Sequence, residues 1–235
     1  MAEHMDHISK QFNEELHEAR NKMLEMGGLV EQQVSKAITA IMSRDSELAI
    51  EVIESDKKVN DMEMLIDEEC MLILARRQPA ATDLRMVLTI LRAVHDLERM
   101  GDEACKVAKA AEKLSSLGGI GRSYLEIKHI GEHVTRMVHD SLDAFARLDS
   151  QQAIAVAEED RSVDLEYGTA MRSLVTYMME DPRSISAVQE VLWSLRSLER
   201  VGDHANNIAE HVIYLVKGWD VRHTSVAEVV ERLNK

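Results

Sequence analysis

The sequence has few of the residues that interrupt or cross-link a chain. Among its 235 residues are two prolines, two cysteines and ten glycines, and aromatic residues make up 3%. Alanine, leucine, methionine, glutamate and arginine recur instead, and these residues favour helix. We therefore expect an all-α protein, long enough to bury a core as one large domain or two small ones.

Long apolar runs are also missing. No run approaches the roughly 20 residues that span a bilayer, and the amino terminus lacks the apolar core of a signal peptide. The sequence thus predicts a cytoplasmic protein without membrane insertion. Cys70 and Cys105 are accordingly expected to be reduced, packed thiols rather than a disulfide.

Positive charge is in deficit, with a formal net charge of −14. Proteins that neutralise the phosphates of DNA or RNA need clustered lysine and arginine, so no nucleic-acid partner is expected. The sequence also lacks a glycine-rich phosphate loop, a G-x-S-x-G elbow and a placed cysteine–histidine pair. We interpret the chain as a non-enzyme.

Apolar residues recur at spacings of three and four through most of the chain, which is typical of helices packed in bundles. Caps, prolines and glycines at Asp45, Pro79, 118–121, Asp149 and Pro182 divide the pattern. The Gly27-Gly28 pair weakens the middle of the first helix. The predicted helices are 9–43, 46–77, 82–114, 123–148, 151–180 and 184–217, with a short one at 226–233.

The two halves of the chain repeat one another. Residues 97–102 read LERMGD and residues 198–203 read LERVGD, a shift of 101 residues, while Asp56 returns as Asp160, a shift of 104. Long helices joined by short turns pack antiparallel. The fold class is therefore all-α, with two tandem antiparallel three-helix bundles related by an internal repeat. The predicted parts are a first bundle at 1–117, a second at 122–217 and a tail at 218–235.

Acidic residues interrupt the apolar seams where core residues are expected. In an antiparallel hairpin, residues equidistant from the turn lie at the same level. Both Asp56 with Asp102 and Asn60 with Glu98 are centred on position 79, in the first turn. Each hairpin should thus gather four oxygen-bearing side chains. The two squares are Asp56, Asn60, Glu98 and Asp102, and Asp160, Asp164, Glu199 and Asp203.

Such a gathering of carboxylates is unfavourable unless positive charge offsets it. The neighbouring Arg99 and Arg200, protonation of one acid, or a bound metal ion would each do so. Oxygen ligands suit magnesium, manganese or iron better than zinc. We predict metal sites at these eight residues, against the alternative of a polar layer that only fixes helix register.

Residues 98–102 and 199–203 resemble the paired E(D)-x-x-x-D motifs of the PhoU family. Residues 12–30 and 77–85 resemble further segments of that family, so the resemblance extends over nearly the whole chain. It implies a homodimeric cytoplasmic regulator that holds the phosphate-starvation response off when phosphate is plentiful. The implied partners are a PhoR-type sensor histidine kinase and the PstB-type ATPase of the PstSCAB phosphate transporter.

The resemblance also implies metal clusters on the acidic motifs, with Glu98, Asp102, Glu199 and Asp203 as ligands. Asp56, Asp160 and Asp164 would lie opposite them. Asn60 stands where the second half has Asp164. An amide offers an oxygen without charge, so the first square should hold metal less strongly than the second.

Two other interpretations remain open. Glu14-x-x-His17 and Glu126-x-x-His129 match the E-x-x-H pairs of di-iron or di-manganese carboxylate enzymes. These pairs are not at equivalent repeat positions, and we expect them on solvated faces. A helical scaffold with no role in phosphate control is the other possibility.

Overall fold

The computed structural model describes residues 2–117 and 124–233, and within them the chain is helical without strands. A short 3-10 turn, η1 (Pro182–Ser184), precedes the sixth helix. All the predicted helices are present. They are α1 (Ala2–Ser43), α2 (Ser46–Arg77), α3 (Ala81–Leu117), α4 (Tyr124–Arg147), α5 (Ser150–Glu180), α6 (Ile185–Lys217) and α7 (Val226–Leu233).

Aspartates begin the second helix of each half. The Asp45 carboxylate accepts a hydrogen bond from the Leu48 backbone N–H at 3.0 Å, and Asp149 accepts from the N–H groups of Gln151 and Gln152 at 2.8 and 3.2 Å. These bonds satisfy amide groups that have no partner inside the helix. They fix where α2 and α5 start.

The second turn of each half contains a proline. Gln78 ends α2 in the left-handed conformation, with φ 49°, and Pro79 follows it. In the second half, the N–H of Asp181 closes α5 on the Tyr177 carbonyl, and Pro182 opens η1. Both connections are too short for anything but an antiparallel return.

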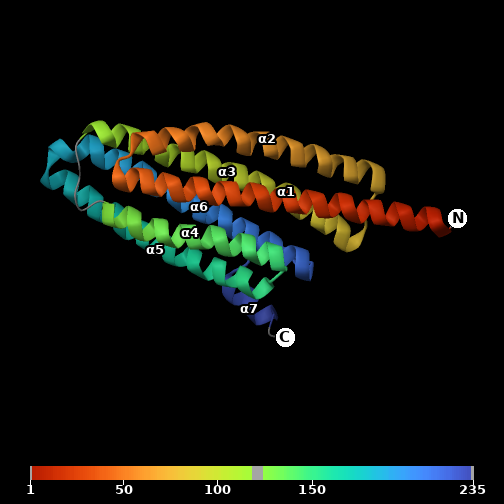
Figure 1. The fold of residues 1–235 in the computed structure, drawn as a ribbon. Coiled ribbons are helices and arrows are strands. Elements are labelled where there is room, and N and C mark those ends of the chain that lie inside the picture. The colour runs from red at the N-terminus through yellow and green to blue at the C-terminus, as the bar shows by residue number, and fades with distance from the viewer. Residues whose placement is uncertain (1, 118–123, 234–235) are drawn as a thin grey trace.

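The helices form two bundles that lie side by side (Figure 1). α1, α2 and α3 pack on one another, as do α4, α5 and α6, and contacts of α3 with α6 and of α1 with α4 join the two sets. α2 and α5 are therefore the outer helices. This arrangement confirms the predicted fold class. The predicted glycine-rich boundary at 118–121 lies outside the described residues.

One apolar core runs through both bundles. Its largest fully buried side chains come from α1, α2, α3 and α4, and α6 adds small and branched residues such as Val201 and Ala205. Burying a large apolar side chain contributes about 1.5 to 3 kcal/mol. Examples are Met23, Met26, Ile41, Ile66, Ile90, Leu97, Met100, Ile130, Met137 and Phe145.

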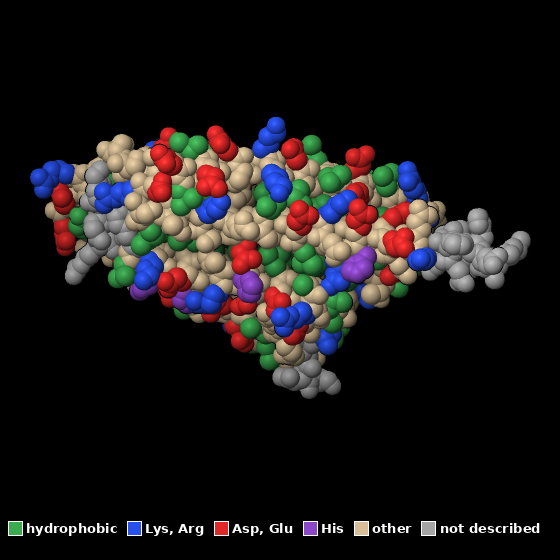
Figure 2. Space-filling model, viewed as in Figure 1, with side chains coloured by type: hydrophobic (Ala, Val, Ile, Leu, Met, Phe, Trp, Pro, Cys, Tyr) green, Lys and Arg blue, Asp and Glu red, His purple; other side chains and the backbone are tan. Residues whose placement is uncertain are grey.

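Both cysteines are free and buried, as predicted, and burial raises the pKa of each thiol to about 12. No helix in the described part of the chain is long and apolar enough to cross a membrane. Acidic and basic side chains are interspersed over the face seen in Figure 2.

A buried carboxylate ties the two bundles together. Asp96 of α3 contacts His204 Nδ1 at 2.8 Å and His211 Nε2 at 3.0 Å, and Asn207 Nδ2 donates to it at 3.0 Å. Burial alone would raise the pKa of Asp96, but hydrogen bonds from His204, His211 and Asn207 lower it to about 2. Separating α3 from α6 would remove all three partners and leave a buried charge unpaired. This contact therefore fixes the position of α6 along α3.

The glycine pair in α1 is compatible with one unbroken helix. A Cβ at Gly27 would lie 2.5 Å from Leu142 Cδ2 of α4, whereas a Cβ at Gly28 would meet nothing within 4 Å. Gly27 therefore allows α1 and α4 to approach closely. Gly28 has no such packing role.

This difference predicts opposite behaviour of two neighbouring variants. Gly28→Ala should stabilise the protein by about 0.5 to 1 kcal/mol, because alanine loses less backbone entropy in a helix. Gly27→Ala has the same advantage in backbone entropy, but its methyl group must displace Leu142. It should therefore be less stable than Gly28→Ala. Urea unfolding of both variants measures the difference, and equal midpoints would contradict the packing argument.

Candidate metal centre

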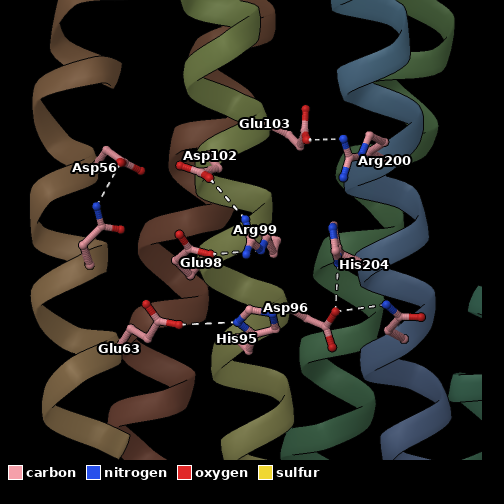
Figure 3. Close-up of polar contacts among 12 residues, drawn as sticks. Asp56, Glu63, His95, Asp96, Glu98, Arg99, Asp102, Glu103, Arg200 and His204 are labelled. Carbon is pink, nitrogen blue, oxygen red and sulfur yellow. Dashed lines mark hydrogen bonds and ion pairs between the residues drawn. The ribbon is translucent and has the colours of Figure 1, made fainter.

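In the first hairpin, the acids of the predicted square pair mainly along their own helices (Figure 3). On α2, Asn60 Nδ2 donates to Asp56 Oδ2 at 3.2 Å. On α3, Arg99 lies 3.5 Å from Glu98 Oε2 and 3.8 Å from Asp102 Oδ2. Arg99 thus offsets part of the negative charge, as one of the sequence alternatives anticipated.

Glu98 instead gathers with two residues one turn nearer to the hairpin turn. Glu63 of α2, His95 and Glu98 each offer one ligand atom, and these atoms lie within 4.8 Å of one another. His95 Nδ1 is 3.6 Å from Glu63 Oε1. Burial raises the pKa of Glu98, and the charges of Asp102 and Glu63 raise it further. We call Glu63, His95 and Glu98 the histidine–glutamate cluster.

The sequence contains a pattern that predicts this cluster. Glu63 and His95 are also equidistant from position 79, so the rule that paired Asn60 with Glu98 pairs them as well. Their types are those of metal ligands. Acids in the apolar seam do not point to this pair, because His95 lies on the exposed face of α3.

A second group of oxygens meets above Gly101. A Cβ at this position would lie 3.1 Å from Asp56 Oδ1 and 3.2 Å from Gln33 Oε1 of α1. Both oxygens are buried; Gln33 Oε1 accepts no hydrogen bond from the described residues, and the Asp56 carboxylate faces the Cys105 thiol. The amide nitrogen of Gln33 donates to Ser55 Oγ, which leaves its oxygen directed elsewhere. Two acceptors facing the space over a glycine fit a cation or a donor between them.

The second hairpin brings three of its four predicted acids together. Asp164 of α5 and Glu199 and Asp203 of α6 each offer an oxygen, and these oxygens lie within 4.8 Å of one another. Asp160 lies one turn earlier on α5, where Asn206 Nδ2 donates to it at 3.2 Å. We call Asp164, Glu199 and Asp203 the carboxylate cluster.

Crowding shifts the acids of this hairpin toward their neutral forms. Burial, followed by the charges of Asp203, Asp164 and Glu199, raises the pKa of Asp160 to about 7. Burial and the charge of Asp203 raise the pKa of Glu199, and burial and the charge of Asp164 raise that of Asp203. Like charges held close in a partly buried site produce this pattern.

Arginine offsets only part of this charge. Arg196 Nη1 donates to Glu199 Oε1 at 2.8 Å, but Glu199 Oε2 is buried and accepts no hydrogen bond from the described residues. Arg200, predicted as a counterion, instead lies 3.2 Å from Glu103 of α3. The unpartnered carboxylate oxygen and the three converging ligands fit a divalent cation.

The repeat preserves the backbone but changes the ligands. In the second half, Tyr167 and Arg196 stand at the repeat positions equivalent to Glu63 and His95. The Arg196 guanidinium lies 5.9 Å from the centroid of the Tyr167 ring. Met137 takes the place of Gln33 beside Gly202. The second hairpin therefore offers carboxylates alone, and the first offers an imidazole and amide oxygens as well.

The E-x-x-H pairs do not form a comparable group. His17 and His129 are exposed, and neither belongs to a metal-type cluster in the part of the chain that the structure describes. His204 and His211 are bound to Asp96. Nothing in this geometry favours a di-iron enzyme.

Comparison with known proteins gives one consistent answer. The model of the PhoU domain matches residues 23–111 and 127–212. The phosphate-specific transport system accessory protein PhoU homolog of Pseudomonas putida is 60% identical over 217 residues, covering 92% of this chain and 85% of that protein. The Escherichia coli K12 accessory protein PhoU is 48% identical over 224 residues, covering 95% and 92%.

Solved structures agree with the sequence comparison. The crystal structure of PhoU from Pseudomonas aeruginosa has a TM-score of 0.87 and 58% identity. The match covers 88% of this chain and 100% of that chain. The phosphate transport system regulatory protein PhoU from Streptococcus pneumoniae has a TM-score of 0.82 and 33% identity, covering 88% and 98%. The chain belongs to the PhoU family.

Proposed function

We propose that this protein is a negative regulator of the phosphate-starvation response that acts by binding rather than by catalysis. Its relatives are named as accessory proteins of the phosphate-specific transport system, which supports a role in the phosphate system. The finer proposal is that it couples a PstSCAB-type transporter, through the PstB-type ATPase, to a PhoR-type sensor kinase in the cytoplasm.

The carboxylate cluster carries the proposal of metal binding. Three carboxylates converge from α5 and α6, and one arginine contact leaves Glu199 Oε2 without a partner. A divalent cation held by Asp164, Glu199 and Asp203 would offset their repulsion and join the two helices. When bound, it would supply positive charge and cross-linking, with Asp160 as a further oxygen nearby.

The two clusters should prefer different metals. Oxygen ligands alone suit magnesium or manganese in the carboxylate cluster. The imidazole of His95 suits iron, manganese or another transition ion in the histidine–glutamate cluster. The Gln33 and Asp56 oxygens over Gly101 offer an additional place for a cation, although Asn60 lowers the charge there.

Exposed apolar side chains on the outer helices support protein partners. Met64 and Met71 of α2 are 68% and 61% exposed, and Leu165 and Met179 of α5 are 75% and 80% exposed. Met64 and Met71 are seven residues apart and so lie on one face of α2, and contiguous exposed apolar surface marks protein-binding sites. We assign these helices to contacts with the kinase, the ATPase or a second copy in a homodimer.

Metal binding can be tested by thermal unfolding of metal-stripped protein. Adding magnesium or manganese at about a hundred times Kd should raise the melting temperature by about 5 to 10 °C. Glu199→Gln combined with Asp203→Asn should abolish most of this rise. Glu158→Gln, an exposed acid on α5, is the matched control and should keep it.

The histidine–glutamate cluster has its own readout. His95→Gln should remove bound iron, measured by elemental analysis after dialysis, while leaving the magnesium-dependent rise in melting temperature intact. If magnesium still raises the melting temperature of the Glu199→Gln/Asp203→Asn double variant, the carboxylate site would be contradicted. Unchanged metal content in His95→Gln would contradict a role for the imidazole.

Asp160 predicts a pH dependence in the metal-free protein. Its pKa of about 7 in the folded chain lies above the ordinary value of 3.8, so folding favours its protonated form. The associated stability is present at low pH and is lost as pH rises through about 7. Asp160→Asn, which keeps an acceptor for Asn206, should therefore lose less stability between pH 5 and 8 than the wild type does.

Melting curves in EDTA across this range provide the measurement. Glu158→Gln should follow the wild type at every pH. Parallel pH profiles for Asp160→Asn and the wild type would show that the crowded site does not hold this proton.

Regulation is tested by alkaline phosphatase output in phosphate-rich medium. A deletion strain should give high output, and the wild-type gene should restore low output. The Glu199→Gln and Asp203→Asn gene should restore it only in part if metal occupancy contributes to signalling. Low output in the deletion strain would overturn the proposed regulatory role.

A further inference from the structure

A basic groove crosses the junction of the two bundles, between α3 and α6. It has a volume of about 340 Å³, and five cationic side chains line it against two carboxylates. In a chain of net charge −14, this local reversal of sign is unusual. Converging lysine and arginine side chains attract phosphate groups. The five cations are Lys106, Lys109, Lys113, Arg196 and Arg200.

The carboxylates in the groove do not neutralise all of this charge. Buried Glu103 is shared by Lys106 at 2.8 Å and Arg200 at 3.2 Å, and Glu190 accepts from Lys113 at 3.2 Å. Lys109 is exposed and forms no ion pair within the described ranges. Lys109 is thus free to bind an anion, and the ion-paired side chains of Lys106, Lys113 and Arg200 are still 53%, 55% and 48% exposed.

An exposed tryptophan lies at one end of the groove. Trp193 is 56% exposed, although the sequence contains only two tryptophans. Lys113 Nζ lies 5.7 Å from the centroid of its ring. An indole ring beside cations is a common platform for stacking a base of a nucleotide.

The distance along the groove from Trp193 to the cations at the other end matches the length of a nucleotide. α3 and α6 run antiparallel, with Lys113 beside Trp193 and Glu103 beside Arg200. Seven residues separate Lys106 from Lys113, which corresponds to about 10 Å along a helix. A base on Trp193 would therefore place its phosphates among the cations toward the other end.

We propose that this groove binds a nucleoside di- or triphosphate, with the base on Trp193 and the phosphates on Lys106, Lys109 and Arg200. The assignment does not depend on metal binding. If the carboxylate cluster holds metal as proposed above, the two sites are connected, because Arg196 lines the groove and also donates to Glu199. Phosphate near Arg196 would compete with Glu199 for its guanidinium.

Calorimetric titration in EDTA tests the groove separately from the metal clusters. The probes are ATP and ADP, adenosine as the base without phosphate, and pyrophosphate and inorganic phosphate as the anion without a base. ATP and ADP should bind more tightly than any of the fragments. Lys109→Glu and Trp193→Ala should each weaken ATP binding about fivefold or more, and Trp193→Phe should recover most of the loss.

Lys58→Glu, the same charge reversal at an exposed site on α2, is the control and should leave the affinity unchanged. Lys109 pairs with no carboxylate in the described structure, so its substitution should not impair folding, which circular dichroism checks. Absence of ATP and ADP binding would overturn the proposal. Binding that is indifferent to Lys109→Glu, or equal affinity for pyrophosphate with no effect of Trp193→Ala, would also overturn it.

Discussion

The register of the two helical hairpins is the constraint on which the rest of the structure depends. Turns of a few residues at Pro79 and Asp181 force α2 back along α3 and α5 back along α6, so residues equidistant from each turn must share a level. Asp164 is thereby brought opposite Glu199, with Asp203 one turn away. The apolar seam holds the helices together, and the carboxylates cannot separate without breaking it. Their repulsion must be offset at the site.

The duplicated architecture supports two different chemical environments. The shared backbone keeps a glutamate, a glycine and an aspartate at matching positions of α3 and α6. Around them, the first half provides Gln33, Glu63 and His95, whereas the second provides Met137, Tyr167 and Arg196. Charge is thus concentrated in the second hairpin and spread over amide and imidazole groups in the first. If both sites hold metal as proposed, they would respond to different ions.

Much of this arrangement follows from local rules in the sequence. Capping aspartates and prolines predict the helix ends, and hairpin symmetry predicts the carboxylate cluster. Residues that meet across bundles follow no such rule. Asp96 binds His204 and His211, and Arg200 turns to Glu103, only because α3 packs on α6. Gln33 of α1 lies beside Gly101, as Asp56 does, although it is outside the hairpin. These contacts depend on how the bundles dock, which apolar periodicity does not specify.

A divalent cation bound to the carboxylate cluster, as proposed, would offset the repulsion among its three acids. Anomalous diffraction from crystals of the metal-stripped protein soaked in manganese would test it most directly. We expect a manganese peak bonded to oxygens of Asp164, Glu199 and Asp203, at about 2.0 to 2.5 Å. A map with no peak there, and with these three carboxylates paired to arginines or to one another, would contradict it.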